Sequence, residues 1–138
     1  MTPASQERGR DAAARGSEVV IVVEDEPTVR VPIVRTLRNR GFTVLEAANG
    51  AEALRIVAGH QGTIACVVTD VMMPEMKGTE LVEALRLASP KMCAVFISGL
   101  PAELAGVDYE SIGGAAFLTK PFSLASLAEQ VRALIEGA

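Results

Sequence analysis

Residues 64–78 read IACVVTDVMMPEMKG. This stretch begins as a run of apolar and β-branched residues, and the run ends in a carboxylate, Asp70. Short continuous runs of this kind are typical of strands that are buried on both faces of a parallel sheet. In an open parallel sheet, ligands bind beyond the carboxyl ends of the strands. The stretch therefore predicts a buried strand that presents Asp70 at such an edge.

Three further stretches have the same form, an apolar strand-like run followed by a polar residue. They are EVVIVVEDEP (18–27) with Glu24 and Asp25, CAVFIS (93–98) with Ser98, and AAFLTKPF (115–122) with Lys120. Because parallel strands end at the same edge of a sheet, the chain is predicted to gather three carboxylates, a hydroxyl and an ammonium in one crevice. That set suits a divalent cation and a phosphoryl group.

Helical patterns separate these strands. The spacing of apolar residues predicts helices over 27–39, 50–59, 80–88 and 124–136, and a further strand over 43–47. The glycine-rich segment 99–114 leaves room only for a short fourth helix, over Ala102 to Tyr109. Pro32 should remove one hydrogen bond from the first helix and kink it. Five β/α pairs predict an α/β fold, a doubly wound five-stranded parallel sheet in a three-layer sandwich.

Composition and charge argue against nucleic acid and membranes as partners. The 138 residues suffice for one domain, over 18–138, and a net charge of -4 without a basic stripe argues against nucleic acid as a partner. Residues 1–17 lack the apolar core of a signal peptide and are expected to be a disordered tail or linker. No apolar run is long enough for a membrane span, so we expect a cytoplasmic protein without a membrane partner. Cys66 and Cys93 have no metal-ligand spacing, and Cys66 is predicted to be a buried small hydrophobe.

Each polar residue also has a plain structural interpretation. Glu24 and Asp25 could form an acidic helix start that the helix dipole favours, and Asp70 could be a turn residue. Ser98 could simply end its strand. All these polar residues stand at successive strand ends, which argues against the structural interpretations holding for every one of them. Clustered carboxylates repel one another, so the pattern predicts a cation that offsets them.

With these residues in place, the chain resembles a response-regulator receiver domain, the phospho-accepting module of two-component signalling. The resemblance covers about residues 18–137. It rests on the acid pair, on Asp70 with Pro74 and Gly78, on the hydroxyl that ends a strand, and on the Lys-Pro-Phe element that begins at Lys120. It implies the flavodoxin-like (βα)5 receiver fold.

The resemblance also implies roles for the residues around the acceptor. Asp70 would be phosphorylated, Ser98 would hydrogen-bond the phosphoryl group, and Lys120 would neutralise it. Phe117 falls at the position of the family's switch aromatic, which changes rotamer with Ser98. The surface that changes would comprise the fourth helix, the fifth strand and the fifth helix.

A metal site is implied as well. Asp25 would bind Mg2+, or Mn2+, most directly, and Glu24 would act mainly through water. Asp70 and the backbone carbonyl of Met72 would complete the protein ligands. Glutamate in place of aspartate at position 24 departs from the family's commonest pattern and should leave metal binding intact.

The implied partner is a histidine kinase or a histidine phosphotransfer protein. The chain would then be no enzyme beyond its own phosphorylation and dephosphorylation. A receiver module from a longer hybrid histidine kinase is one alternative, favoured by the SGL and VMMPEM sequences at 98–100 and 71–76. A small Mg2+-dependent phosphohydrolase with Asp70 as nucleophile is another, although the chain has no residues to spare for a substrate cap. A degenerate receiver that works without phosphorylation is a third, and the intact set of site residues argues against it.

Overall fold

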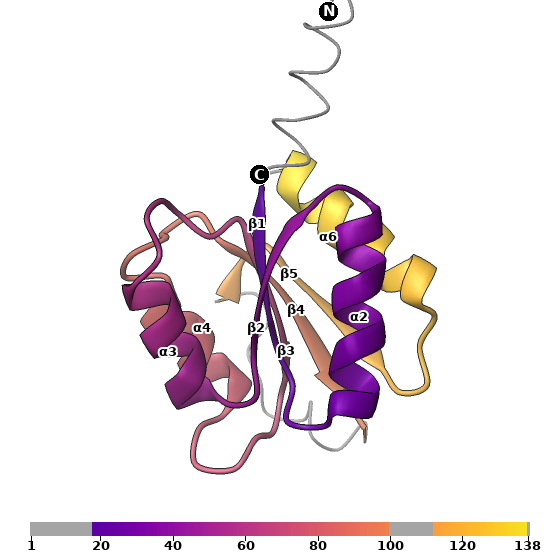
Figure 1. Ribbon diagram of the computed structural model, residues 1–138, viewed down its shortest axis with the longest axis horizontal. Coiled ribbons are helices and arrows are strands. Elements are labelled where there is room, and N and C mark those ends of the chain that lie inside the picture. Colours follow the sequence, from indigo (N-terminus) through magenta and orange to yellow (C-terminus); the bar gives the residue numbers. More distant parts are fainter. Residues whose placement is uncertain (1–17, 100–111, 138) are drawn as a thin grey trace, which may run out of the picture.

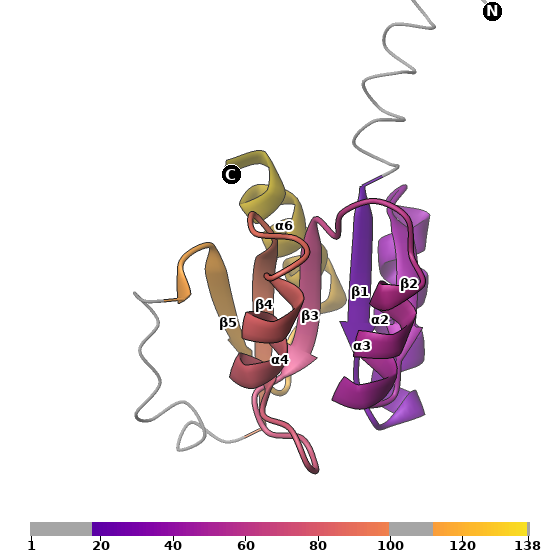
Figure 2. The ribbon, with the colours of Figure 1, turned by 90° about the vertical axis from the view of Figure 1, so that its left-hand side faces the viewer.

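The apolar runs form a single parallel sheet. The computed structural model describes residues 18–99 and 112–137, and the sheet in this part has five strands in the order β2-β1-β3-β4-β5. The strands are β1 (Val19–Val23), β2 (Thr43–Ala47), β3 (Cys66–Asp70), β4 (Cys93–Ser98) and β5 (Ala115–Thr119). Figure 2 shows them side by side, with β2 and β5 at the two edges. The predicted doubly wound α/β fold is confirmed.

The described helices are α2 (Pro27–Asn39), α3 (Gly50–Ala58), α4 (Gly78–Leu85) and α6 (Leu124–Gly137). Helix α4 begins two residues earlier and ends three residues earlier than its predicted range. Pro32 lies inside α2, and the helix continues across it to Asn39; the expected kink stays a prediction. The short helix expected over Ala102 to Tyr109 and the tail expected over 1–17 lie outside the described residues.

Local chemistry sets where two of the helices begin. Pro27 stands in the first turn of α2, where its fixed φ suits the helix and its missing N–H costs no hydrogen bond. The side chain of Asn49 caps α3, because its Oδ1 accepts a hydrogen bond from the backbone N–H of Glu52 at 2.8 Å. After α2, Gly41 adopts a φ of 96°, a left-handed conformation that glycine tolerates and that turns the chain toward β2.

Two apolar cores lie on opposite faces of the sheet. One is covered by α2 and α6 and contains both cysteines, which are free and buried, as predicted for Cys66. The other is covered by α3 and α4 and centres on Phe96. Figure 1 shows the two helix pairs on either side of the sheet. None of the described helices is long and apolar enough to cross a membrane.

The topology brings the polar strand ends together. The order of the strands reverses between β1 and β3, because β2 lies on one side of β1 and all later strands lie on the other. In the β1/β3 register Val23 pairs with Thr69, so the next residues along each strand, Glu24 and Asp70, are neighbours. Ligands bind at such a reversal point in open parallel sheets.

Candidate functional site

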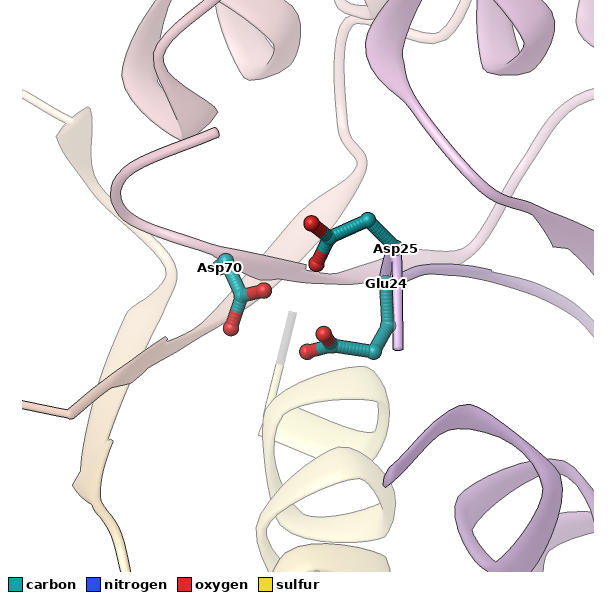
Figure 3. Close-up of side chains that lie close together, drawn as sticks. All are labelled: Glu24, Asp25 and Asp70. Carbon is teal, nitrogen blue, oxygen red and sulfur yellow. The ribbon is translucent and has the colours of Figure 1, made fainter. Parts of the chain in front are cut away.

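Three carboxylates converge at this edge of the sheet. Glu24, Asp25 and Asp70 each offer one carboxylate oxygen, and these oxygens all lie within 4.8 Å of one another (Figure 3). Glu24 and Asp70 are buried, with exposed fractions of 1% and 8%, whereas Asp25 is exposed. The predicted convergence of the acid pair with Asp70 is therefore present in the structure.

The carboxyl group of Glu24 is buried and only partly hydrogen-bonded. Its Oε1 accepts a hydrogen bond from the backbone N–H of Glu26 at 3.1 Å, while its Oε2 is buried without a hydrogen-bond partner. Burial, and then the neighbouring carboxyl group of Asp70, raises the pKa of Glu24 from 4.5 to about 8. A buried carboxylate oxygen with no donor, beside two further carboxylates, fits a divalent cation that would take the place of the missing donor.

Lys120 supplies the positive charge at the site. Its Nζ lies 3.8 Å from Oδ1 of Asp70 and 3.9 Å from Oε2 of Glu24, so the ammonium stands between the two buried carboxylates. The backbone N–H of Lys120 donates to the carbonyl oxygen of Ser98 at 2.8 Å. This bond ties the residue after β5 to the end of β4, and it fixes the base of the lysine beside the carboxylates.

Ser98 ends β4 and is buried, with an exposed fraction of 1%. In the β3/β4 register Asp70 pairs with Ile97, and the N–H of Val71 donates to the carbonyl oxygen of Ile97 at 2.9 Å. Ser98 directly follows Ile97, so it lies beside the end of β3. It is therefore at the same edge of the sheet as Asp70, as predicted.

The loop after Asp70 is held close to the sheet. The N–H of Gly78 donates to the carbonyl oxygen of Val71 at 2.8 Å, which closes the loop over residues 71–78. A Cβ at Gly78 would overlap the carbonyl oxygen of Asp70, so only glycine allows this approach. Glu75 turns the loop with a φ of 72°. Met72 lies in this loop, two residues after Asp70.

Phe117 lies on β5 opposite Phe96 on β4, and the two rings stack with centroids 5.1 Å apart and planes 10° from parallel. Phe117 is the predicted switch aromatic, whereas Phe96 was not predicted to contribute. The β4/β5 register pairs the two residues directly. This pairing could not be predicted from the sequence, because it depends on how the two strands align.

Arg30 is a second residue that sequence reasoning missed. From the first turns of α2, its Nη1 donates to the carbonyl oxygen of Glu24 at 2.7 Å, and its Nε donates to Oε1 of Glu46 at 3.3 Å. The guanidinium thus fixes the backbone of the acid pair to β2. Nothing in the sequence pattern marks an arginine on a helix as a partner for a carbonyl at a strand end.

Comparison with known proteins agrees with this geometry. The family model described as the response regulator receiver domain matches residues 20–132. The chain belongs to this family, whose members are phospho-accepting signalling modules of two-component systems.

Two relatives and one solved structure show the range of similarity. The chain is 43% identical to the sensor kinase CckA of Brucella abortus over 88% of its own length and 13% of that protein. It is 31% identical to the probable transcriptional regulatory protein TcrX of Mycobacterium tuberculosis, over 84% of this chain and 49% of that one. The crystal structure of the receiver domain from the hybrid histidine kinase CckA superposes with a TM-score of 0.71 at 39% identity, covering 85% of this chain and 98% of that domain. The chain thus spans half or less of the length of these two relatives.

Proposed function

We propose that Asp70 is the phosphoacceptor and that a histidine kinase or a histidine phosphotransfer protein is the donor. The observation that carries this proposal is the position of Asp70 between two other carboxylates and the ammonium of Lys120, at the edge where the strand order reverses. A carboxylate attacks a phosphoryl group poorly, because both are anionic. The site therefore has to supply positive charge as well as a nucleophile.

A divalent cation, Mg2+ or Mn2+, fits the carboxylates. Glu24, Asp25 and Asp70 would hold it together with the backbone carbonyl of Met72, and Mg2+ accepts such sites with several waters retained. The buried Oε2 of Glu24 without a donor supports this assignment. When bound, the cation would stabilise the negative charge on the phosphoryl group during its transfer.

The chain's own residues do the rest. An oxygen of Asp70 attacks phosphorus, the bond to the imidazole nitrogen of the donor breaks, and that nitrogen keeps the electron pair. Lys120 lies 3.8 Å from Asp70 before transfer and offsets the negative charge that arrives with the phosphoryl group. The domain then acts as a signalling module that turns over only its own acyl phosphate.

Ser98 and Phe117 form the proposed switch. Phosphorylation adds about -1.5 to -2 charge and strong acceptor oxygens. The hydroxyl of Ser98 then moves toward the phosphoryl group, and the ring of Phe117 occupies the space beside β4. The consequence is a changed surface around β5 and α6, which a downstream protein reads.

The identities to the two relatives indicate the kind of signalling protein in which the domain acts. The 43% identity to a sensor kinase exceeds the 31% identity to a transcriptional regulatory protein. This difference favours a receiver of the kind attached to hybrid histidine kinases, which would exchange phosphate with a histidine phosphotransfer protein.

The test is phosphorylation of the isolated chain by acetyl phosphate with Mg2+. The wild type should gain one phosphate that hydroxylamine removes, as an acyl phosphate requires. Asp70→Asn should gain none, because the amide keeps the shape and lacks the nucleophile. Glu83→Gln, at an exposed acid on α4, is the matched control and should behave as the wild type. A hydroxylamine-sensitive phosphate on Asp70→Asn at the wild-type rate would show that the acceptor lies elsewhere.

A further inference from the structure

A hollow lies at the amino-terminal edge of the sheet, opposite the edge that carries Asp70. Its lining consists of residues 63–65 and 89–93, which lead into β3 and β4, and of Ile135 near the end of α6. This amino-edge pocket has a volume of about 370 Å³, and the amino ends of the strands point upward in Figure 2. The volume falls within the range of small-molecule sites in proteins.

The walls of the amino-edge pocket are largely apolar. Ile64 and Met92 are buried members of the core under α3 and α4, whereas Cys93 belongs to the core under α2 and α6. Ile135 packs against the second of these cores from α6. The pocket is thus lined by residues of both apolar cores, and a ligand that fills it would need an apolar body.

Several hydrogen-bond acceptors on these walls are already used within the protein. The hydroxyl oxygen of Ser89 accepts from the N–H of Ile64 at 2.9 Å. The carbonyl oxygen of Ser89 accepts from the N–H of Met92 at 3.0 Å, and that of Ala65 accepts from the N–H of Cys93 at 2.9 Å. A ligand that donates hydrogen bonds would find these acceptors occupied.

Three donor groups on the lining, in contrast, have no acceptor among the described residues. The hydroxyl hydrogen of Ser89 has none, although the residue is only 3% exposed. The hydroxyl of Thr63 and the ammonium of Lys91, both on exposed residues, hydrogen-bond to no described residue and form no ion pair with one. The lining contains no aspartate or glutamate. Unused donors and a cation favour a ligand with a negatively charged acceptor group.

Two features near the pocket that would repel an anion are offset. Helix α6 ends at this edge, and the C-terminus of a helix carries partial negative charge. The carbonyl oxygen of Leu134, in the last turn of α6, accepts from the thiol of Cys93 at 3.2 Å. Glu136 follows Ile135 in the sequence, and its Oε2 lies 4.0 Å from Nε of Arg132, which offsets its charge.

We propose that the amino-edge pocket binds a small apolar carboxylate. The hydrocarbon part of the ligand fills the hollow, and its carboxylate accepts from the unused donors of Ser89 and Lys91. The pocket lies at the other end of the strands from Asp70 and shares no lining residue with that site. The proposal therefore stands apart from the proposed function.

The first experiment measures how affinity depends on chain length. The full chain, in EDTA, is titrated with butyrate, hexanoate and octanoate while NMR follows the methyl signals of Ile64, Met92 and Ile135. Octanoate should shift these signals, and affinity should rise about fourfold for each methylene group that becomes buried. Equal affinity for butyrate and octanoate, or shifts confined to residues around Asp70, would overturn the proposal.

The second experiment changes the head group at constant chain length. Octanoate should bind more tightly than octanol, because only octanoate pairs with the ammonium of Lys91, and octylammonium should bind most weakly. Lys91→Gln should weaken octanoate binding about threefold, as expected for an exposed ion pair, and should leave octanol binding unchanged. Arg55→Gln, at an exposed cation on α3, is the matched control and should bind octanoate as the wild type does. Octylammonium that binds as tightly as octanoate would contradict the proposed ligand charge.

The third experiment fills the pocket. Ile135→Trp should abolish octanoate binding, because the larger side chain takes up the hollow. Ala133→Trp places the same side chain at an exposed position of α6 and should bind octanoate as the wild type does. Unchanged affinity in Ile135→Trp would place octanoate elsewhere and overturn the assignment.

A second copy of the chain is the competing occupant. The same methyl signals are therefore recorded over a range of protein concentrations without any probe. They should not move. Shifts of Ile64, Met92 and Ile135 that grow with protein concentration would assign the amino-edge pocket to self-association and overturn the proposal.

Discussion

The buried carboxyl group of Glu24 should make the metal-free protein less stable as pH rises. Its pKa is about 8 in the folded protein, against an ordinary value of 4.5 that applies to the unfolded chain. Between these values the folded state binds more protons than the unfolded state, so the free energy of unfolding falls with increasing pH. The contribution of Glu24 to the free energy of unfolding is fully present below pH 4.5 and is lost as the pH rises through 8. Glu24→Gln removes this titration while it keeps the side chain's shape.

The magnitude follows from the two pKa values. Between pH 5.5 and pH 8 the titration of Glu24 lowers the free energy of unfolding by about 3 kcal/mol. The 1% exposed fraction of the residue means that solvent screens little of this effect. The stability of Glu24→Gln relative to wild type should therefore increase by about 3 kcal/mol across this range.

Urea unfolding of both proteins in EDTA, at pH 5.5 and pH 8, measures the difference directly. Titrating groups that lie away from the site are common to both proteins and cancel in the comparison. Mg2+ should stabilise the wild type more at pH 8 than at pH 5.5, because protons and the cation compete for the same oxygens. A free energy of unfolding of Glu24→Gln relative to wild type that instead stays constant or falls between pH 5.5 and pH 8 would contradict this prediction. Either result would show that the surroundings of Glu24 do not hold its carboxyl group protonated.

Three further outcomes are expected. Asp25→Ala should weaken Mg2+ binding by about tenfold or more in calorimetric titration, and unchanged affinity would remove Asp25 from the ligands. Met72→Asn should lose phosphate about fivefold faster than wild type, because an amide can orient water; equal decay rates would end this argument. Ser98→Ala should still accept phosphate on Asp70 but transmit less of the change. The readout is NMR shifts at residues 112–119 on addition of beryllofluoride, and wild-type-sized shifts there would show that the hydroxyl is not the trigger.

The strands were the most predictable part of the fold. The ranges 43–47, 93–98 and 115–119 agree with β2, β4 and β5 to the residue. Continuous β-branched runs carry this information locally, because a strand buried on both faces has to be apolar throughout. The boundaries of α4 were less predictable. The helix begins at Gly78, where the side chain of Glu80 accepts a hydrogen bond from the backbone N–H of Lys77, and the apolar pattern does not show this contact.

The convergence of the site also followed from the sequence. The polar residues stand at strand ends, and parallel topology sends those ends to one edge. The structure confirms the acid cluster and the approach of Lys120 to it. What the sequence could not show is how unequal the acids are. Glu24 and Asp25 are adjacent in the chain, yet one is buried and the other exposed.

The sequence is therefore sufficient to predict which residue types reach the edge of the sheet, since local apolar runs mark the strands and the polar residues that follow them. The environment of each residue, in contrast, depends on how the elements pack. The pKa of Glu24, the stacking of Phe96 on Phe117 and the exposure of Met72 beside its buried neighbour Met73 depend on contacts between segments far apart in the chain. Burial and register are properties of how elements pack, and no single segment encodes them.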